Sequence, residues 1–291
     1  MQALGDAMAI GCALAWALAV LAFRRVEGVS PAALNLFKNT LASGLLLVTM
    51  LAIGMPFDGQ RGALDWGALA LSGVLGLAVA DTLFLAGLRR VDASIAAIAD
   101  CAYAPTVLLL SIVTLGEPLG AGLLAGAPLV VLGLAIVGWE PRGGSTKKVD
   151  RRGLALCIAG VVATAFAAVI AKPALDRSDL IEATTVRLAA GSVALLAWET
   201  AAGRREAALA LFTPHQAWRW AVPGALLGSY LAMILWLGGM KYGTASRAAL
   251  LNQSAAVFVL LLSRFVGEAV PPRRWVGAGV ALLGVLAVLL L

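Results

Sequence analysis

Five charged residues lie inside long apolar stretches of the sequence: Lys38, Asp81, Asp100, Arg187 and, nearer the end of its stretch, Arg264. A charge at the centre of a lipid bilayer costs about 2.5 to 3.5 kcal/mol on insertion scales, so each position is a candidate for function. We expect Lys38 and Arg187 to face a central cavity and to attract a carboxylate of a ligand. Asp81 or Asp100 would attract an ammonium group or pair with those cations, which together favours a zwitterion. Alternatively, each charge pairs only to lower its own insertion cost, or its side chain extends to a membrane interface.

Uncharged polar residues and aromatic residues in the same stretches complete the predicted ligand site. The polar candidates are Asn39, Tyr103, Tyr230, Asn252 and Gln253, and the aromatic candidates for apolar walls are Trp16, Phe84 and Trp236. Hydrogen bonds between helices explain such polar residues about as often as ligand binding does. Packing therefore stays open as the alternative for each of them.

The chain offers little for catalysis or metal binding. Its one histidine, His215, and three widely spaced cysteines cannot build a multi-histidine metal site or a nucleophile–histidine pair within the apolar stretches. The sequence has no G-x-x-x-x-G-K-[ST] loop for ATP. We expect no catalytic residue, no metal and no other cofactor. An intramembrane enzyme would need a nucleophile, base or metal ligands clustered at one depth.

Composition places the chain among membrane proteins. Of its 291 residues, 61% are hydrophobic and 13% charged, whereas soluble domains have about 25% charged residues. The net charge of +6 comes from Lys and Arg in short clusters between apolar runs, which are typical of topology signals. We expect a lipid bilayer and a small-molecule substrate as partners, and no nucleic acid. The oligomeric state stays open.

Ten apolar segments are long enough to span a bilayer. A core of about 30 Å requires about 20 residues of helix, because unpaired backbone groups are not tolerated in lipid. The predicted helices cover residues 7–23, 33–53, 66–88, 93–115, 119–139, 153–172, 182–202, 218–240, 245–266 and 274–291. The predicted fold class is an all-α integral membrane protein with ten transmembrane helices.

An internal repeat organises these helices. A shift of 152 residues superposes Gly87 on Gly239, Phe84 on Trp236, Ala93-Ser94 on Ala245-Ser246, and VLLLS at 107–111 on VLLLS at 259–263. A shift near 149 places Lys38 on Arg187. We predict a five-helix unit at 1–142, a polar linker at 143–151 and a second unit at 152–291. Because five is odd, the units would insert in opposite directions, a transporter design with a midplane site between the halves and alternating access.

Both halves carry three further shared features. These are a cation early in the second helix, a small-residue fourth helix after GLRRVDASIAAI or GMKYGTASRAAL, and Gly-Glu before the last helix, at 116–117 and 267–268. The unit resembles the EamA-type repeat of the drug/metabolite transporter superfamily over nearly the whole chain. The resemblance implies a bacterial inner-membrane carrier that exports small metabolites, with exporters of amino acids, aromatic ones included, as the best-known ten-helix members. DCAYAP at 100–105 departs from the Asn/Tyr/Trp-rich stretch of family members with large substrates.

Loop charges and the Gly-Glu turns give two more expectations. Loops after helices one, three, five, seven and nine carry fourteen Lys and Arg residues, against five on the other side, which predicts periplasmic termini; the family resemblance implies cytoplasmic ones. Glu117 and Glu268 are expected to stabilise the N-terminus of the helix that follows each of them.

The predicted function is a secondary transporter that exports small polar or zwitterionic metabolites, amino acids first, across the inner membrane. Movement would follow a gradient, an exchange or a proton. A facilitative channel, or a carrier of another metabolite or drug, is the main alternative, and a channel would show fluxes that do not saturate. A non-transporting sensor or assembly factor would need no continuous polar cavity between the halves.

Overall fold

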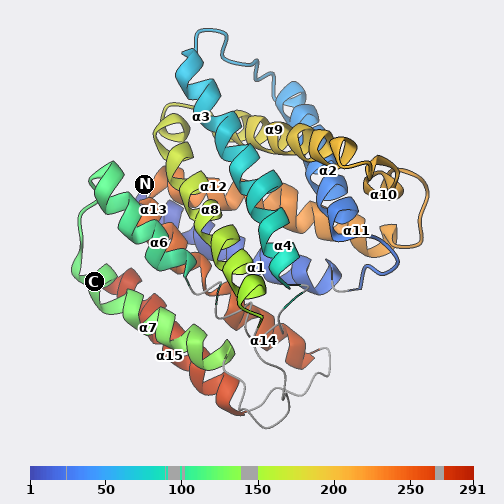
Figure 1. The fold of residues 1–291 in the computed structure, drawn as a ribbon. Coiled ribbons are helices and arrows are strands. Elements are labelled where there is room, and N and C mark those ends of the chain that lie inside the picture. The colour runs from blue at the N-terminus through green and yellow to red at the C-terminus, as the bar shows by residue number, and fades with distance from the viewer. Residues whose placement is uncertain (24, 89, 91–98, 100–101, 139–149, 266–271) are drawn as a thin grey trace.

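The computed structural model describes residues 1–291 except 24, 89, 91–98, 100–101, 139–149 and 266–271 (Figure 1). Every regular element among the described residues is helical. Seven helical stretches in this part of the chain are long and apolar enough to cross a membrane, and shorter apolar helices accompany them. The predicted all-helical membrane fold is confirmed.

The first half of the chain contains five helical segments. They are α1 (Gln2–Phe23), α2 (Pro31–Ala52), a third segment made of α3 (Ala63–Gly73), η1 (Val74–Ala80) and α4 (Asp81–Leu88), a fourth made of α6 (Tyr103–Leu110) and η2 (Ser111–Leu115), and α7 (Ala121–Gly138). Ser30 caps α2, because its hydroxyl accepts a hydrogen bond from the Ala33 amide and Pro31 occupies the first turn.

The second half repeats this order. It contains α8 (Arg151–Asp176), α9 (Leu180–Ala201), the short α10 (Arg205–Ala208) and η3 (Ala210–Phe212), then α11 (Trp218–Ala225), η4 (Leu226–Leu231) and α12 (Ala232–Tyr242) as one segment, α13 (Ala245–Asn252) with α14 (Ala255–Phe265), and α15 (Pro272–Leu290). Asp150 caps α8 by accepting the amides of Arg152 and Gly153.

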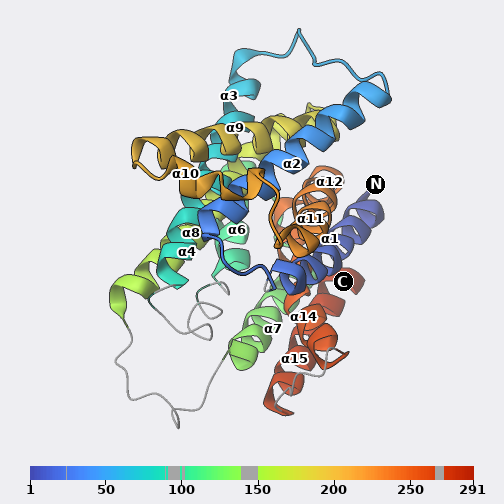
Figure 2. The same ribbon diagram turned by 90° about the vertical axis from the view of Figure 1, so that its right-hand side faces the viewer.

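The two halves pack through reciprocal contacts, in which helices of one half lie against helices of the other. The first helix of each half contacts the end of the third helix of the other, α1 against α12 and α8 against α4. The second helices α2 and α9 contact each other, and the last helices α7 and α15 lie side by side in both views (Figure 1, Figure 2). This reciprocal pattern is that of two units related by a pseudo-two-fold axis.

Glycines allow the first and third helices of opposite halves to come into close contact. A Cβ added to Gly87 on α4 would lie 2.7 Å from the Gly153 carbonyl oxygen on α8, and one added to Gly5 on α1 would lie 2.8 Å from the Gly243 amide. The helix pairs therefore approach at backbone distance, as small residues permit in membranes. Gly5 and Gly153, at the starts of the two halves, lie at opposite ends of the bundle, so the halves are inverted.

The two chain termini lie together, since Met1 and Leu291 line one surface pocket (Figure 1). We call this end of the bundle the terminal end and the other the opposite end. Helix α1 runs away from the terminal end and α2 returns to it, so the loop at residues 53–62 belongs to the terminal end. The α8–α9 turn also belongs there, because Lys241, close to the start of α1, donates to the Leu175 and Ser178 carbonyls.

Two predicted helix limits differ from the structure, and one predicted helix is interrupted. Helix α1 starts at Gln2 instead of 7, and α8 continues through Pro173 to Asp176 instead of ending at 172. The proline lies in the last turn of α8, where Lys172 pairs with Asp176 one turn later. The ninth predicted helix is broken at 253–254 into α13 and α14. Part of the predicted helix at 93–115 lies outside the described residues.

Candidate functional site

A cavity of about 250 Å³ lies between the two halves, and we call it the central cavity. Helices of both halves contribute to its wall. The structure brings most of the predicted site residues to it: Trp16, Lys38, Asn39, Asp81, Tyr103, Arg187, Trp236, Asn252 and Gln253. These residues come from seven of the helical segments, so only the assembled pair of halves creates the cavity.

Three predicted site residues are not among those that line the cavity. The Tyr230 hydroxyl lies 2.8 Å from the Thr49 hydroxyl, in a contact between η4 and α2. Phe84 packs against Cys157 on α8, whose thiol lies near the Phe84 carbonyl. Asp100 lies outside the described residues. Phe84 and Trp236 are equivalent in the repeat, but the Phe84 ring packs between helices and the Trp236 ring lines the cavity.

Lys38 and Asp81 form an ion pair at the cavity wall. The Lys38 ammonium lies 3.9 Å from an Asp81 carboxylate oxygen and donates a hydrogen bond of 3.1 Å to the Asn39 amide oxygen. Asn39 in turn donates to the Asn35 side chain one turn earlier on α2. The charge of Lys38 is therefore balanced within the first half. This is the arrangement expected if the pair forms to lower the cost of placing Lys38 in the membrane.

Arg187, the repeat counterpart of Lys38, has no such partner. Its residue surface is only 1% exposed, and its Nε and Nη1 atoms make no hydrogen bond to any part of the chain that the structure describes. The guanidinium lies over the Trp236 ring, 5.2 Å from the ring centre. A ring face attracts a cation but leaves the N–H groups at its edge unsatisfied. Arg187 can therefore still take an anionic group.

Three uncharged polar groups on the same wall also lack partners among the described residues. They are the Ser229 hydroxyl, the Asn252 amide oxygen and the Gln253 amide nitrogen, all buried. A buried polar atom without a partner costs about 1 to 3 kcal/mol. Donors and acceptors are thus left open around one cavity, which is the arrangement expected of a site that a polar ligand completes.

Irregular helix geometry creates these open groups. The π-helical stretches η1 and η4 begin at Val74 and Leu226, which the shift of 152 residues makes equivalent. Each puts two consecutive residues on the cavity wall, Gly76-Leu77 and Gly228-Ser229, and π-helical turns occur often at functional sites. The break between α13 and α14 similarly presents Asn252 and Gln253. Broken helices are a common way to build midplane sites in transporters.

A close backbone contact positions Arg187. A Cβ added to Gly73 would lie 2.1 Å from the Arg187 carbonyl oxygen. Only glycine therefore lets α9 approach α3 this closely, because any side chain at Gly73 would overlap the α9 backbone. The position of Arg187 depends on this contact at Gly73, the last residue of α3 before η1.

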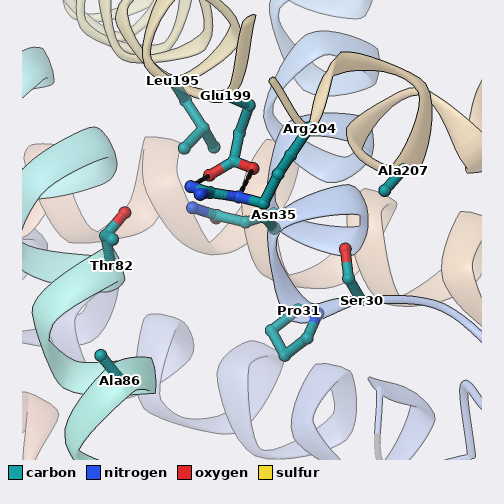
Figure 3. Close-up of a pocket in the computed structure, with 10 residues that line it drawn as sticks. Ser30, Pro31, Asn35, Thr82, Ala86, Leu195, Glu199, Arg204 and Ala207 are labelled. Carbon is teal, nitrogen blue, oxygen red and sulfur yellow. Dashed lines mark hydrogen bonds and ion pairs between the residues drawn. The ribbon is translucent and has the colours of Figure 1, made fainter. Parts of the chain in front are cut away.

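A second cavity of about 380 Å³, which we call the vestibule, lies toward the opposite end. Figure 3 shows Pro31 and Asn35 on α2 facing Thr82 and Ala86 on α4 across it. The Asn35 side chain, which lines the vestibule, accepts a hydrogen bond of 3.2 Å from Asn39, which lines the central cavity. The two cavities are therefore separated by about one turn of α2.

An ion pair of the second half stands at the vestibule. Arg204 donates to both oxygens of Glu199, at 2.9 and 3.0 Å (Figure 3). The hydrogen bonds that Arg204 donates to Glu199 raise the pKa of Arg204 above its ordinary value, and the opposite charge of the carboxylate adds to this. The vestibule therefore carries an ion pair at its wall.

Two ion pairs join the halves at the terminal end, and we call them the terminal-end clamp. Arg61 pairs with Glu182, which also accepts a hydrogen bond of 2.8 Å from the Asp58 amide. The Arg61 and Glu182 side chains are only 3% and 1% exposed. Arg177 donates to both oxygens of Asp65, at 2.9 and 2.5 Å. Hydrogen bonding to Asp65 raises the pKa of Arg177.

Glu117 acts between the halves, contrary to the expectation that it stabilises its own following helix. Its carboxylate accepts hydrogen bonds from the Ala245 amide at 2.7 Å and from the amide and hydroxyl of Ser246. These amides begin α13, so Glu117 of the first half caps a helix of the second half. Its repeat counterpart Glu268 lies outside the described residues.

Sequence reasoning missed several residues that the structure brings to the cavity and the clamp. Cys12, Thr164, Ser229 and Met233 line the central cavity, although each is common in buried apolar helices and gave no signal by type. Glu182 was placed at a helix end. Its acidic side chain in the first turn of α9 was the available signal.

The EamA-like transporter family matches this chain twice, over residues 3–139 and 151–290. A protein of known crystal structure superposes with a TM-score of 0.80 over 97% of this chain and 95% of its own, at 20% identity, which shows the same fold. No curated protein matches the sequence. The two matches cover both halves, and we conclude that this multi-pass membrane protein belongs to the EamA-like transporter family of the drug/metabolite type.

Proposed function

We propose that the chain is a secondary carrier that exports small polar or zwitterionic metabolites, amino acids first, across the bacterial inner membrane. One observation carries the proposal: Arg187 is buried at the wall of a cavity between the halves, without a hydrogen-bond partner for Nε and Nη1 among the described residues. A buried cation in a membrane protein needs an anionic partner. A substrate carboxylate supplies it.

The proposed binding mode uses the residues already on the cavity wall. Arg187 and the Gln253 amide nitrogen bind the substrate carboxylate. Asp81 or Asp100 attracts the substrate ammonium group. If Asp81 does so, the ammonium group replaces Lys38 as its ion-pair partner. Trp16 and Trp236 lie along the apolar part of the substrate. The cavity of about 250 Å³ suits a small metabolite better than a lipid or a peptide.

Alternating access is the proposed mode of movement. The terminal-end clamp joins the halves on one side of the cavity, and the vestibule lies on the other. Rocking of the units proposed at 1–142 and 152–291, joined by the linker at 143–151, would break the clamp and close the vestibule. Loop charges support a cytoplasmic opposite end, so the vestibule would admit substrate from the cytoplasm, in keeping with export.

The test is transport by purified protein in liposomes. A panel of labelled amino acids is offered to the wild type, to Arg187→Ala and Lys38→Ala, and to Arg205→Ala, which removes an exposed cation of α10 as a matched control. We expect saturable transport that Arg187→Ala reduces at least about tenfold, a loss of 1.4 kcal/mol or more in binding, and that Arg205→Ala leaves intact. Unchanged transport in both Arg187→Ala and Lys38→Ala would overturn the carboxylate site.

The same liposomes separate a carrier from a channel. A carrier with alternating access saturates with substrate and exchanges substrate faster when both compartments contain it. A facilitative channel gives a flux that rises in proportion to concentration and no exchange. A linear flux through the wild-type protein would therefore favour the channel.

A further inference from the structure

The two cations that line the central cavity, Lys38 of the first half and Arg187 of the second, have different surroundings. In the first half, Lys38 on α2 is matched by Asp81 on α4, 3.9 Å away. The shift of 152 residues that relates α4 to α12 places Asp81 on Met233. Met233 also lines the central cavity. The second half thus has a thioether where the first half has the carboxylate that neutralises its cation.

Met233 lies on the same face of α12 as Trp236, the ring that contacts Arg187. Trp236, whose ring lies 5.2 Å from the Arg187 guanidinium carbon, follows Met233 by three residues on α12, and residues three apart share one face of a helix. Both side chains line the same cavity as Arg187. A carboxylate at position 233 would therefore face the guanidinium as Asp81 faces Lys38.

We propose that Met233 is a specificity-determining residue that reserves Arg187 for the carboxylate of the substrate. With methionine in place of a built-in counter-ion, the second half leaves the Arg187 Nε and Nη1 atoms without a partner among the described residues, whereas Lys38 is already balanced by Asp81. The inference rests on the proposed transport function and deepens it. The ligand class is a small organic carboxylate whose apolar part lies along the Trp236 ring, and the carboxylate is indispensable for binding.

Charge balance supports this assignment. Among the described residues of the cavity wall, Lys38 and Asp81 cancel, which leaves the single positive charge of Arg187. Buried charges in a medium of low dielectric constant are stable only when paired. A ligand that brings one carboxylate to Arg187 completes the pairing, and one without a carboxylate leaves the guanidinium unpaired.

The experiment compares Met233→Asp with Met233→Asn, which differ by one charge at nearly equal size. Ligand binding is followed by the shift in thermal unfolding midpoint of the purified full chain with phenylalanine, phenylpropionate or phenethylamine. We expect phenylpropionate, which keeps the carboxylate, to stabilise the wild type, and phenethylamine, which lacks it, to give no shift. Met233→Asp should bind phenylpropionate at least about tenfold more weakly than Met233→Asn.

A ligand-free measurement separates this inference from the proposed function. Because an aspartate would pair with the buried Arg187, Met233→Asp should unfold at a higher temperature than Met233→Asn without any ligand. If no probe binds even to the wild type, the proposed function fails for these substrates while the unfolding comparison still decides the pairing. A midpoint of Met233→Asp at or below that of Met233→Asn would overturn the pairing.

The double variant Asp81→Asn with Met233→Asp moves the built-in carboxylate to the other half. Lys38 then becomes the unpaired cation, and we expect phenylpropionate binding to return relative to Met233→Asp alone. Failure to return would show that position 233 acts through shape instead of charge, which overturns the proposal.

Discussion

The Arg187 guanidinium carbon lies 5.2 Å from the centre of the Trp236 ring, at the wall of the central cavity. A desolvated contact of a cation with an indole face is worth about 2 kcal/mol or more. It stabilises the charge without neutralising it, so the guanidinium edge stays available. The repeat counterparts Lys38 and Asp81 instead form an ion pair. The first half of the protein therefore contains an ion pair at the cavity wall, and the second half contains a cation whose Nε and Nη1 atoms have no hydrogen-bond partner among the described residues.

Replacement of Trp236 tests the role of this ring. We expect Trp236→Leu to weaken substrate binding about tenfold, because the loss of a contact of about 2 kcal/mol removes support for Arg187 and an apolar wall. Trp236→Phe should lose less, since a smaller ring keeps a π face. Equilibrium binding to purified protein measures both. Trp275→Leu, at an exposed ring of α15, serves as control, and an equal loss there would contradict the prediction.

The terminal-end clamp predicts an effect on accessibility. Glu182→Gln removes the charge that holds the buried Arg61, so the terminal end should open more often. Cys12 lines the central cavity, and its reaction with a membrane-impermeant thiol reagent, in a chain with Cys101 and Cys157 replaced by alanine, reports opening. We expect faster labelling from the terminal-end side in Glu182→Gln than in the parent.

Two comparisons make this result specific. The exchange of the pair, Arg61→Glu with Glu182→Arg, should slow the labelling again because the attraction is restored. Glu206→Gln, at an exposed acid of α10, should leave the rate unchanged. Equal labelling of Cys12 in the parent and in Glu182→Gln would mean that the clamp does not hold the terminal end closed.

The close contact between α3 and α9 at Gly73 should determine where Arg187 lies in the site. An alanine at this position would place its Cβ 2.1 Å from the Arg187 carbonyl oxygen, so α9 must shift. We expect Gly73→Ala to weaken substrate binding and to lower the thermal unfolding midpoint. Gly67→Ala on the same helix, where an added Cβ meets nothing within 4 Å, is the matched control. Loss of binding in Gly67→Ala as large as in Gly73→Ala would reject the explanation.

Glu117 predicts a stability effect without an effect on ligand selectivity. Its carboxylate accepts three hydrogen bonds at the start of α13, and bonds to a charged group contribute about 1.5 to 3 kcal/mol each. Glu117→Ala should therefore lower the unfolding midpoint more than Thr244→Ala, which removes an ordinary helix cap worth about 1 kcal/mol. Differential scanning fluorimetry of detergent-solubilised protein compares them. A smaller loss in Glu117→Ala than in Thr244→Ala would contradict this role.

Helix content and the repeat could be predicted because both depend on residues close in sequence or at a constant shift. The apolar runs gave the spanning helices, and the equivalence of Gly87 with Gly239 located a packing contact that both halves use. The limits of α8 and the break at Gln253 could not be predicted, because a proline near a helix end is tolerated and the break follows no proline or glycine. These depend on contacts made after folding.

The sequence by itself determined that this chain is a membrane protein of two repeated units with Lys38, Asp81 and Arg187 buried between them. Burial of a charge is costly wherever the helix lies, so residue type and apolar surroundings suffice to identify such positions. Only the tertiary structure decided that Asp81 pairs with Lys38, that Arg61 pairs with Glu182, and that the Arg187 Nε and Nη1 atoms have no hydrogen-bond partner among the described residues. Ion pairs depend on distances of a few ångströms between helices remote in sequence, and those distances are set by how the helices pack.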